Sequence, residues 1–409
     1  MGLTLRLAWR NLWRQPRRTW LTTSAMVFSN VLLIFLISLQ FGMYGMMIDN
    51  TLSLMTGHLQ VQAPGYREAQ KMRQVVPDAG EMAATLRAEL GSERIAARAS
   101  AFVLASSEDR TQGVQLLGVE PDFEPRVSTL PGLVREGRYL ADPQAQEIVV
   151  GRVLARNLRV GIGDELTILG SGRDGSFAAA ILVVVGIFDS GVSDLDRSIA
   201  MTSLGAFQEA FAMQGAGHQV VISATQLAEV PALKAAVEAR LPPGEGLVVH
   251  DWDTLQAGLR QMIQADISSA FFMYAVLVVL VAFSVLNTQL MSVLERTREF
   301  GIVLALGLRP GRLGRLVLLE TALMGIMGAV LGILAGVLVT AWFSKHGLSY
   351  PGLEELAASF NLPGRMYPRL TLWSVLTGPL VVLVFTLLAA VYPALRLRRL
   401  EPVEAMRAA

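Results

Sequence analysis

The loop at 295–315 holds the residues best suited to a specific interaction. Charged side chains crowd its start and an apolar helical face follows; the charged residues are Glu295, Arg296, Arg298 and Glu299, and the apolar face is Phe300, Val303, Leu304 and Gly307. Pro310 and Gly311 then break the helical pattern. The spacing predicts a short amphipathic helix of the kind that one protein inserts into a groove of another. A helix lying flat on a membrane is the alternative, and composition does not choose between the two.

The sequence lacks the residues that most enzyme classes need. No lysine follows a glycine, which excludes the phosphate-binding loop of an ATPase. The four histidines, His58, His218, His250 and His346, are far apart and there is no cysteine, so we expect no metal site. No G-x-S-x-G motif supports acyl transfer. We therefore expect no catalytic residue and no cofactor in this chain.

The apolar residues are concentrated in four windows. The chain is 52% hydrophobic and 17% charged, whereas soluble proteins average about 25% charged. The windows 19–48, 267–294, 316–344 and 370–395 each exceed the roughly 20 residues that cross a bilayer. Their single acid, Glu320, lies five residues after Arg315, so we expect its carboxylate at the membrane surface and no proton relay. Four transmembrane helices are predicted, and no basic surface for nucleic acid.

Arginines predict how the chain is oriented. The segment 1–18, the loop 295–315 and the tail 396–409 are rich in arginine, which favours the cytoplasmic side of a membrane. Both termini are therefore expected in the cytoplasm and residues 49–266 outside it. In segment 1–18, Trp9 and Trp13 lie on one helical face and arginines on another, as in a helix at the membrane interface. A plain basic flank is the alternative.

The outer segment predicts a mixed α+β domain. Seven short runs alternate or are β-branched; they are 58–62, 113–119, 147–150, 165–169, 180–188, 218–222 and 247–250. Helical patterns lie between them, and a composition change hints at two subdomains. The first apolar window, 19–48, is longer than a span needs. The second is also too long, because helical apolar spacing continues before residue 267. We expect both to continue as stalks into the outer domain.

The predicted organisation has nine parts. They are an interfacial helix (1–18), a first span with its stalk (19–48), the outer domain (49–266), a second span (267–294), a cytoplasmic loop (295–315), a third span (316–344), an outer loop (345–369), a fourth span (370–395) and a cytoplasmic tail (396–409).

Several motifs in this order resemble one family. They are LAWRNLWRQPRRT at 7–19, IVVGRVLARNL at 148–158, GIGDEL at 161–166, RTREFGIVLALG at 296–307, LLE at 318–320, PALR at 393–396 and LEPVEAMR at 400–407. Together, with one large domain between the first two spans, they are similar to the MacB/LolC/FtsX family of ABC-transporter permeases, the mechanotransmission type. The resemblance covers nearly the whole chain.

The resemblance implies partners and a mechanism. The permease would work as a pair, with a second copy or a paralogue, above a cytoplasmic ABC ATPase dimer that binds ATP and Mg. Its coupling helix would contain Arg296, Arg298, Glu299, Phe300, Gly301, Val303, Leu304 and Gly307. ATP binding would close the two permeases, and the first two helices would carry that movement to the periplasmic domains. The protein would lie in the bacterial inner membrane.

The resemblance leaves three functions open. Chain length favours extraction of lipoprotein or lipid for a periplasmic carrier. The alternatives are efflux of small molecules or peptides with a periplasmic adaptor, and control of a cell-wall hydrolase. For extraction we expect acyl chains to contact the upper first span, at Phe41, Met43, Tyr44, Met46 and Met47, although ordinary helix packing uses the same residue types.

Small residues in the third span indicate close helix contact. They are spaced to lie on one helical face and are Gly325, Gly328, Gly332 and Gly336. The alternative is the ordinary enrichment of glycine in membrane helices.

Overall fold

The computed structural model describes residues 3–242, 244, 246–349 and 365–397, in two compact units. The helical unit comprises 3–45, 262–349 and 365–397, and the globular unit lies within 46–261. Residues 350–364 of the predicted outer loop, and 398–409 of the predicted tail with the motif at 400–407, lie outside the described residues.

Four helices in the described residues are long and apolar enough to cross a membrane, which confirms the four predicted spans. The helices that form or flank these spans are α1 (Leu3–Arg14), α2 (Pro16–Thr51), α11 (Ala257–Glu295), α12 (Thr297–Ala305), α13 (Pro310–His346) and α15 (Leu372–Arg396). With 36 and 39 residues, α2 and α11 are about 54 and 58 Å long, well beyond a hydrocarbon core of roughly 30 Å. The division between the two units falls within both helices.

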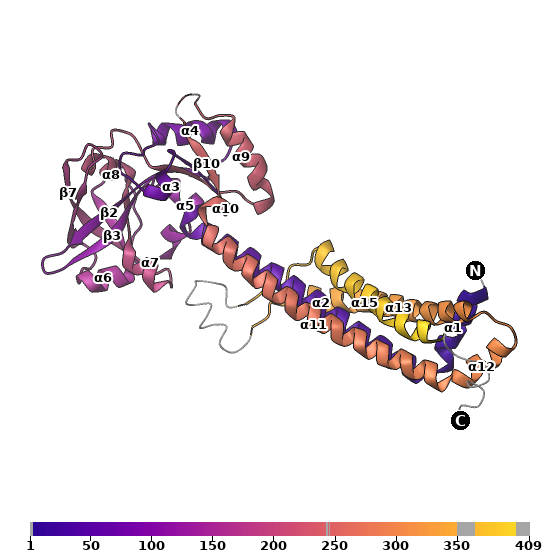
Figure 1. Cartoon of the computed structure of the whole chain (residues 1–409). Coiled ribbons are helices and arrows are strands. Elements are labelled where there is room, and N and C mark those ends of the chain that lie inside the picture. Colours follow the sequence, from indigo (N-terminus) through magenta and orange to yellow (C-terminus); the bar gives the residue numbers. More distant parts are fainter. Residues whose placement is uncertain (1–2, 243, 245, 350–364, 398–409) are drawn as a thin grey trace. The chain divides into compact units, whose positions relative to one another are not determined.

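The glycines of α13 bring its backbone close to α2. A Cβ added at Gly328, Gly332 or Gly336 would lie within 2.8 Å of Met26, Asn30 or Ile34, respectively. The Asn30 side-chain amide donates a 3.3 Å hydrogen bond to the Gly328 carbonyl, which satisfies a polar group inside an apolar contact. Gly325 faces Leu383 of α15 instead, and α13 and α15 lie side by side (Figure 1). The glycine face is thus a packing surface within one chain.

The globular unit is an α+β domain inserted between the first two spans, as predicted. Its strands are β1 (Leu59–Gln62), β2 (Ile95–Ser106), β3 (Thr111–Val119), β4 (Val134–Gly137), β5 (Glu147–Gly151), β6 (Glu165–Ser171), β7 (Phe177–Phe188), β8 (Ile199–Ser203), β9 (Gln219–Ile222) and β10 (Val248–Asp251). They form one sheet in the order β10-β1-β9-β2-β3-β8-β5-β7-β4, with β6 paired to β2 and β7. Pairs β3–β8 and β5–β7 are parallel, and the other pairs are antiparallel.

Short helices complete the globular unit. They are η1 (Leu52–Thr56), α3 (Tyr66–Ala69), α4 (Ala79–Leu90), α5 (Glu124–Val127), η2 (Leu130–Leu133), α6 (Arg152–Leu158), α7 (Ser193–Ser198), α8 (Leu204–Ala210), η3 (Leu227–Glu229), α9 (Val230–Glu238) and α10 (Trp252–Leu255). Buried side chains of α4, α6, α8 and α9 form the main apolar core with one face of the sheet; α4 and α9 lie together beside β10 (Figure 1).

The opposite face of the sheet is divided. On β3, β5 and β8, side chains such as Leu117, Val149 and Met201 form a second, smaller apolar core. On β1 and β9 three of the four corresponding positions carry glutamines, Gln60, Gln62 and Gln219, and the fourth carries Val221. One half of this face therefore excludes water by apolar packing and the other half is polar.

All seven predicted strand runs are strands, but β2, β4 and β8 were not expected. The longest of these, β2, reads IAARASAFVLAS, in which alanines replace the β-branched residues typical of strands. It forms because it lies centrally, paired with β3 and β9 and at one end with β6. Residues 95–99 are buried on both faces, which favours small side chains there, a constraint that local sequence does not display.

The α2–α13 contact predicts a sharp size limit at Gly332. Gly332→Leu should separate the two helices, because its Cβ would lie 2.6 Å from the Asn30 Cβ. It should lower the free energy of unfolding by about 1–3 kcal/mol. Thermal unfolding in detergent would measure the loss. Gly311→Leu is the matched control, since a Cβ there meets no atom within 4 Å; equal losses in both variants would contradict the contact.

The globular unit should lose stability in mild acid through His218. Burial lowers the pKa of His218 to about 4, and its Nδ1 accepts a 3.0 Å hydrogen bond from the Ser100 N–H. In the unfolded chain the pKa is about 6.5, so the unfolded state takes up the proton first. Stability present above pH 6.5 should fall by up to about 1.4 kcal/mol per pH unit toward pH 4.

Pulse proteolysis of the globular unit in urea across this pH range would measure that slope. His218→Gln should flatten it, whereas His250→Gln, at a partly exposed position, should change it less. An unchanged slope in His218→Gln would show that other groups cause the acid sensitivity.

Candidate coupling site

The helix predicted at the start of the 295–315 loop is α12. It follows the end of α11 directly and has nine residues. It ends at Ala305, and Gly307, two residues later, has a φ of 91° in the left-handed region that glycine tolerates best. Pro310 then begins α13 in the first turn, where a proline costs no hydrogen bond. These two residues fix α12 as a short element between two long helices.

The apolar face of α12 points into its own chain. Phe300 is 3% exposed, and with Leu304 it packs against Val293 of α11 and Val317 of α13 in a small core that also holds Leu313 and Leu397. Gly301 is buried and Val303 is half-buried. Phe300 and Leu304 are thus covered by their own chain, since periodicity identifies a covered face without identifying what covers it. That α12 docks on a partner stays a prediction.

The outward surface of α12 has a different composition. Arg298 and Glu299 are exposed, and Ile302 is 48% and Leu306 83% exposed. Gly307 is also exposed. Two aliphatic side chains beside two charges form a small surface of the kind that protein partners bind. Helical periodicity does not point to Ile302 and Leu306, because they fall off the main apolar face.

Glu320 of α13 is held by an ion pair. Its side chain is 5% exposed, and both carboxylate oxygens lie 3.3–3.4 Å from Nη1 of Arg296. The Asn11 amide of α1 donates a 2.6 Å hydrogen bond to the same carboxylate. The depth of Glu320 in the membrane stays a prediction, but its carboxylate is covered by the chain itself. Arg296 and Asn11 compensate its charge inside the protein.

Arg296 joins this buried pair to the exposed end of α12. Its Nε lies 3.5 Å from Glu299, and its guanidinium carbon lies 4.8 Å from the centre of the Phe300 ring. Glu299 also pairs with Arg14 of α1 at 3.2 Å, where both side chains are at least half exposed. Side chains from α1, α12 and α13 thus form one network around Arg296.

Helix α1 and the loop at 295–315 lie at one end of the helical unit (Figure 1). Helix α1 contacts α13, and Leu397, just after α15, packs with Phe300 and Leu304 of α12. That this end faces the cytoplasm stays a prediction from the charge distribution. No group of three or more His, Asp or Glu among the described residues is placed to hold a metal ion. The arrangement is suited to docking and to transmitting force.

The residues predicted to face substrate on α2 have mixed environments. Phe41 and Met43 are exposed, and Met46 and Met47 are half-buried. Tyr44 is buried; its hydroxyl donates to Asp266 of α11 at 2.5 Å. Tyr44 thus joins α2 to α11. Of the five predicted residues, only the other four have accessible surface for a substrate.

Two further polar residues complete this helix contact. Gln40 donates to Asp266 at 3.2 Å and accepts from Tyr274 of α11 at 3.0 Å. Gln40 is a polar residue inside the first apolar window, and Asp266 is the last charge before the second. A polar residue within one apolar window and a charge beside the next are therefore the sequence signal for this contact.

Two family models match the chain. The one described as "MacB-like periplasmic core domain" matches residues 19–240, more than half of the chain, and the one described as "FtsX-like permease C-terminal" matches 271–402. The first contains most of the globular unit and the second contains α12.

Several curated relatives align over most of their length. The lipoprotein-releasing system transmembrane protein LolC of Xylella fastidiosa is 26% identical over 315 residues, which cover 73% of this chain and 74% of the relative. The corresponding LolE of Haemophilus influenzae is 24% identical over 315 residues, 74% of each chain. The macrolide export ATP-binding/permease protein MacB of Sodalis glossinidius is 29% identical over 153 residues, 35% of this chain and 21% of the relative.

The network predicts unequal costs for breaking its two ion pairs. Arg296→Met should lower stability by about 3–5 kcal/mol, because it leaves Glu320 buried with only Asn11 as partner. Arg14→Met should cost less than about 1 kcal/mol, because its pair with Glu299 is solvent-exposed. Thermal unfolding in detergent would compare them.

Adding Glu320→Leu to Arg296→Met should recover much of the loss, since it removes the unpaired charge. No recovery in the double variant would show that Arg296 acts through its contact with Phe300 instead.

Proposed function

This chain belongs to the MacB/LolC/FtsX family of ABC-transporter permeases, and on that premise we propose that it converts ATP hydrolysis by a separate cytoplasmic ATPase into movement of its globular unit. The chain is a multi-pass membrane protein without a nucleotide-binding motif of its own. We infer that the energy for transport comes from a partner that docks on it.

The contacts of α12 support its role as the docking element. Its exposed surface of Arg298, Glu299, Ile302 and Leu306 is free to meet the ATPase. Its other face is fixed by apolar packing to α11 and α13, and Arg296 ties it to Glu320. A push on α12 is therefore transmitted to the transmembrane helices, since bending the loop alone would break a buried ion pair.

The long helices support the transmission step. Helices α2 and α11 each exceed a bilayer core by more than 20 Å, by the rise of about 1.5 Å per residue. The bonds of Tyr44 and Gln40 to Asp266 join them in the helical unit. We infer that the two helices move together and carry displacement into the globular unit, in a complex with a second copy or a paralogue.

The favoured cargo is a lipoprotein or lipid of the inner membrane. The observation that carries this proposal is the alignment with LolC and LolE relatives over about three quarters of both chains. Efflux of small molecules or peptides is the second candidate, favoured by the MacB-like domain at 19–240 and by the MacB relative. A lipoprotein cargo requires a periplasmic carrier, and efflux requires an adaptor.

Co-purification of the permease with its ATPase in nanodiscs would separate the two candidates. Bound lipoprotein that is released on addition of ATP supports extraction. A stable complex with a periplasmic adaptor, and no released lipoprotein, would replace extraction with efflux.

If the ATPase docks on α12, a substitution on the exposed surface of α12 should weaken ATPase binding. Leu306→Asp should lower ATPase binding and ATP-dependent release by about tenfold, because it introduces a charge at an exposed apolar contact, a loss of about 1.4 kcal/mol. Binding and release would be measured with reconstituted permease and ATPase. Ile162→Asp, at an exposed aliphatic position of the globular unit, is the control. Normal ATPase binding by Leu306→Asp would remove α12 from the docking site.

A further inference from the structure

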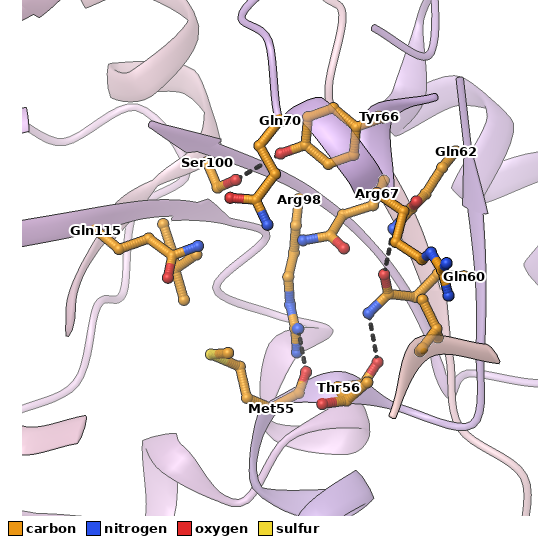
Figure 2. Close-up of a pocket in the computed structure, with 13 residues that line it drawn as sticks. Met55, Thr56, Gln60, Gln62, Tyr66, Arg67, Gln70, Arg98, Ser100 and Gln115 are labelled. Carbon is orange, nitrogen blue, oxygen red and sulfur yellow. Dashed lines mark hydrogen bonds between the residues drawn. The ribbon is translucent and has the colours of Figure 1, made fainter. Parts of the chain in front are cut away.

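A polar pocket opens on the glutamine-bearing half of the sheet (Figure 2). Its volume is about 160 Å³, roughly ten times the 10–15 Å³ that one water molecule requires. Its walls come from β1, β2, β3 and β9 and from the segments η1 and α3. The pocket lies entirely within the globular unit and shares no residue with the coupling site.

Strand register assembles the polar wall. Gln62 of β1 pairs with Gln219 of β9, and Gln219 pairs with Arg98 of β2. Because side chains two apart in a strand share a face, Gln60 joins Gln62 on this wall. Gln115 of β3 and Gln70 also line the pocket. Five glutamine side chains from four segments thus surround one cavity.

The charges in the wall are already neutralised. Arg98 is fully buried and bonds to both carboxylate oxygens of Glu124, at 2.9 and 2.6 Å, and to the Met55 carbonyl. Arg67, at the mouth, pairs with Glu68 and donates to the Thr254 carbonyl. The pocket therefore offers a ligand no unpaired charge, which favours an uncharged ligand.

The glutamines retain unused hydrogen-bonding capacity. Gln60 donates to the Thr56 carbonyl at 2.7 Å and Gln62 donates to Gln60 at 2.6 Å (Figure 2). The Oε1 of Gln62 is buried in a side chain that is 3% exposed, and it has no hydrogen-bond partner within the described residues. An orphaned buried acceptor in a pocket wall calls for an N–H or O–H donor from outside the chain.

The one aromatic ring in the pocket is not available for stacking. Tyr66 lies against the His218 ring with centroids 5.0 Å apart, and its hydroxyl is bonded to Ser100 at 2.7 Å. A sugar would gain little from this ring, because Tyr66 is only 4% exposed. Leu117, Leu255 and Met55 supply apolar surface between the amides. Amide groups alternating with apolar patches match a peptide backbone with small side chains.

We propose that this pocket binds a short, uncharged peptide segment, whose backbone N–H donates to Gln62 and whose carbonyls accept from the free glutamine amides. The volume is below the 300–1,000 Å³ typical of drug-sized ligands, which limits the segment to about two residues. The proposal does not depend on ATP-driven transport, because the site is built wholly from the globular unit.

The absence of cysteine permits a local test in the full chain. Gln70→Cys places a single thiol at the exposed rim of the pocket. The probe is N-acetyl-alanyl-glycine amide, and its binding should slow alkylation of that thiol by N-ethylmaleimide in a saturable way. Gln226→Cys, exposed and outside the pocket, is the control thiol and should react at an unchanged rate.

A second substitution tests the glutamines themselves. In the Gln70→Cys chain, Gln62→Leu should weaken the probe's protection by about tenfold, since it removes the orphaned acceptor. Gln115→Leu, at a half-exposed position, should weaken the probe's protection less. It is the variant to test if Gln62→Leu fails to fold. Circular dichroism would check folding.

Three results would overturn the proposal. Protection by methyl α-glucoside but not by the peptide amide would assign the pocket to a saccharide. Protection by neither would leave a pocket that holds water only. Equal protection in the parent and in both leucine variants would place the peptide outside the glutamine wall.

Discussion

The carboxylate of Glu320 constrains the rest of the helical unit. It lies inside a membrane-spanning helix with almost no access to water, and its charge is balanced by Arg296 from a different element. Separating the two would leave a charge unpaired in a site of low polarity, at a cost of several kcal/mol. Arg296 directly precedes α12. While its ion pair with Glu320 is intact, α12 therefore stays attached to α13.

The remaining contacts extend this constraint across the bundle. Phe300 seats α12 on α11 and α13, and the glycine face of α13 holds α2 at backbone distance. The exposed pair of Arg14 and Glu299 adds little by comparison, because water screens it. The strongest contacts of α12 are thus on its buried side, while its exposed side is held only by the ion pairs of Glu299. One short helix can therefore be firmly attached on one side and keep an exposed surface on the other.

The sequence predicted the structural features that depend on local composition. The four spans and their excess length follow from runs without charge, and seven strands follow from alternation near turns. The environment of α12 did not follow, because amphipathicity predicts that Phe300 and Leu304 are covered but not which body covers them. The partners of Glu320 did not follow for a related reason: Arg296 and Asn11 lie 24 and 309 residues away in the chain.

The globular unit shows the same limit in its sheet. Gln60 and Gln62 alternate with Leu59 and Val61, the pattern of a strand with one face in water. Yet all four residues are buried, because β9 and β2 bring further polar side chains beside them and η1 closes the space. Alternation therefore reports only that a face is polar. Whether that face meets solvent or encloses a cavity is set by strand order, which in this sheet joins β1 to β2 through β9, a strand more than 100 residues farther along the chain.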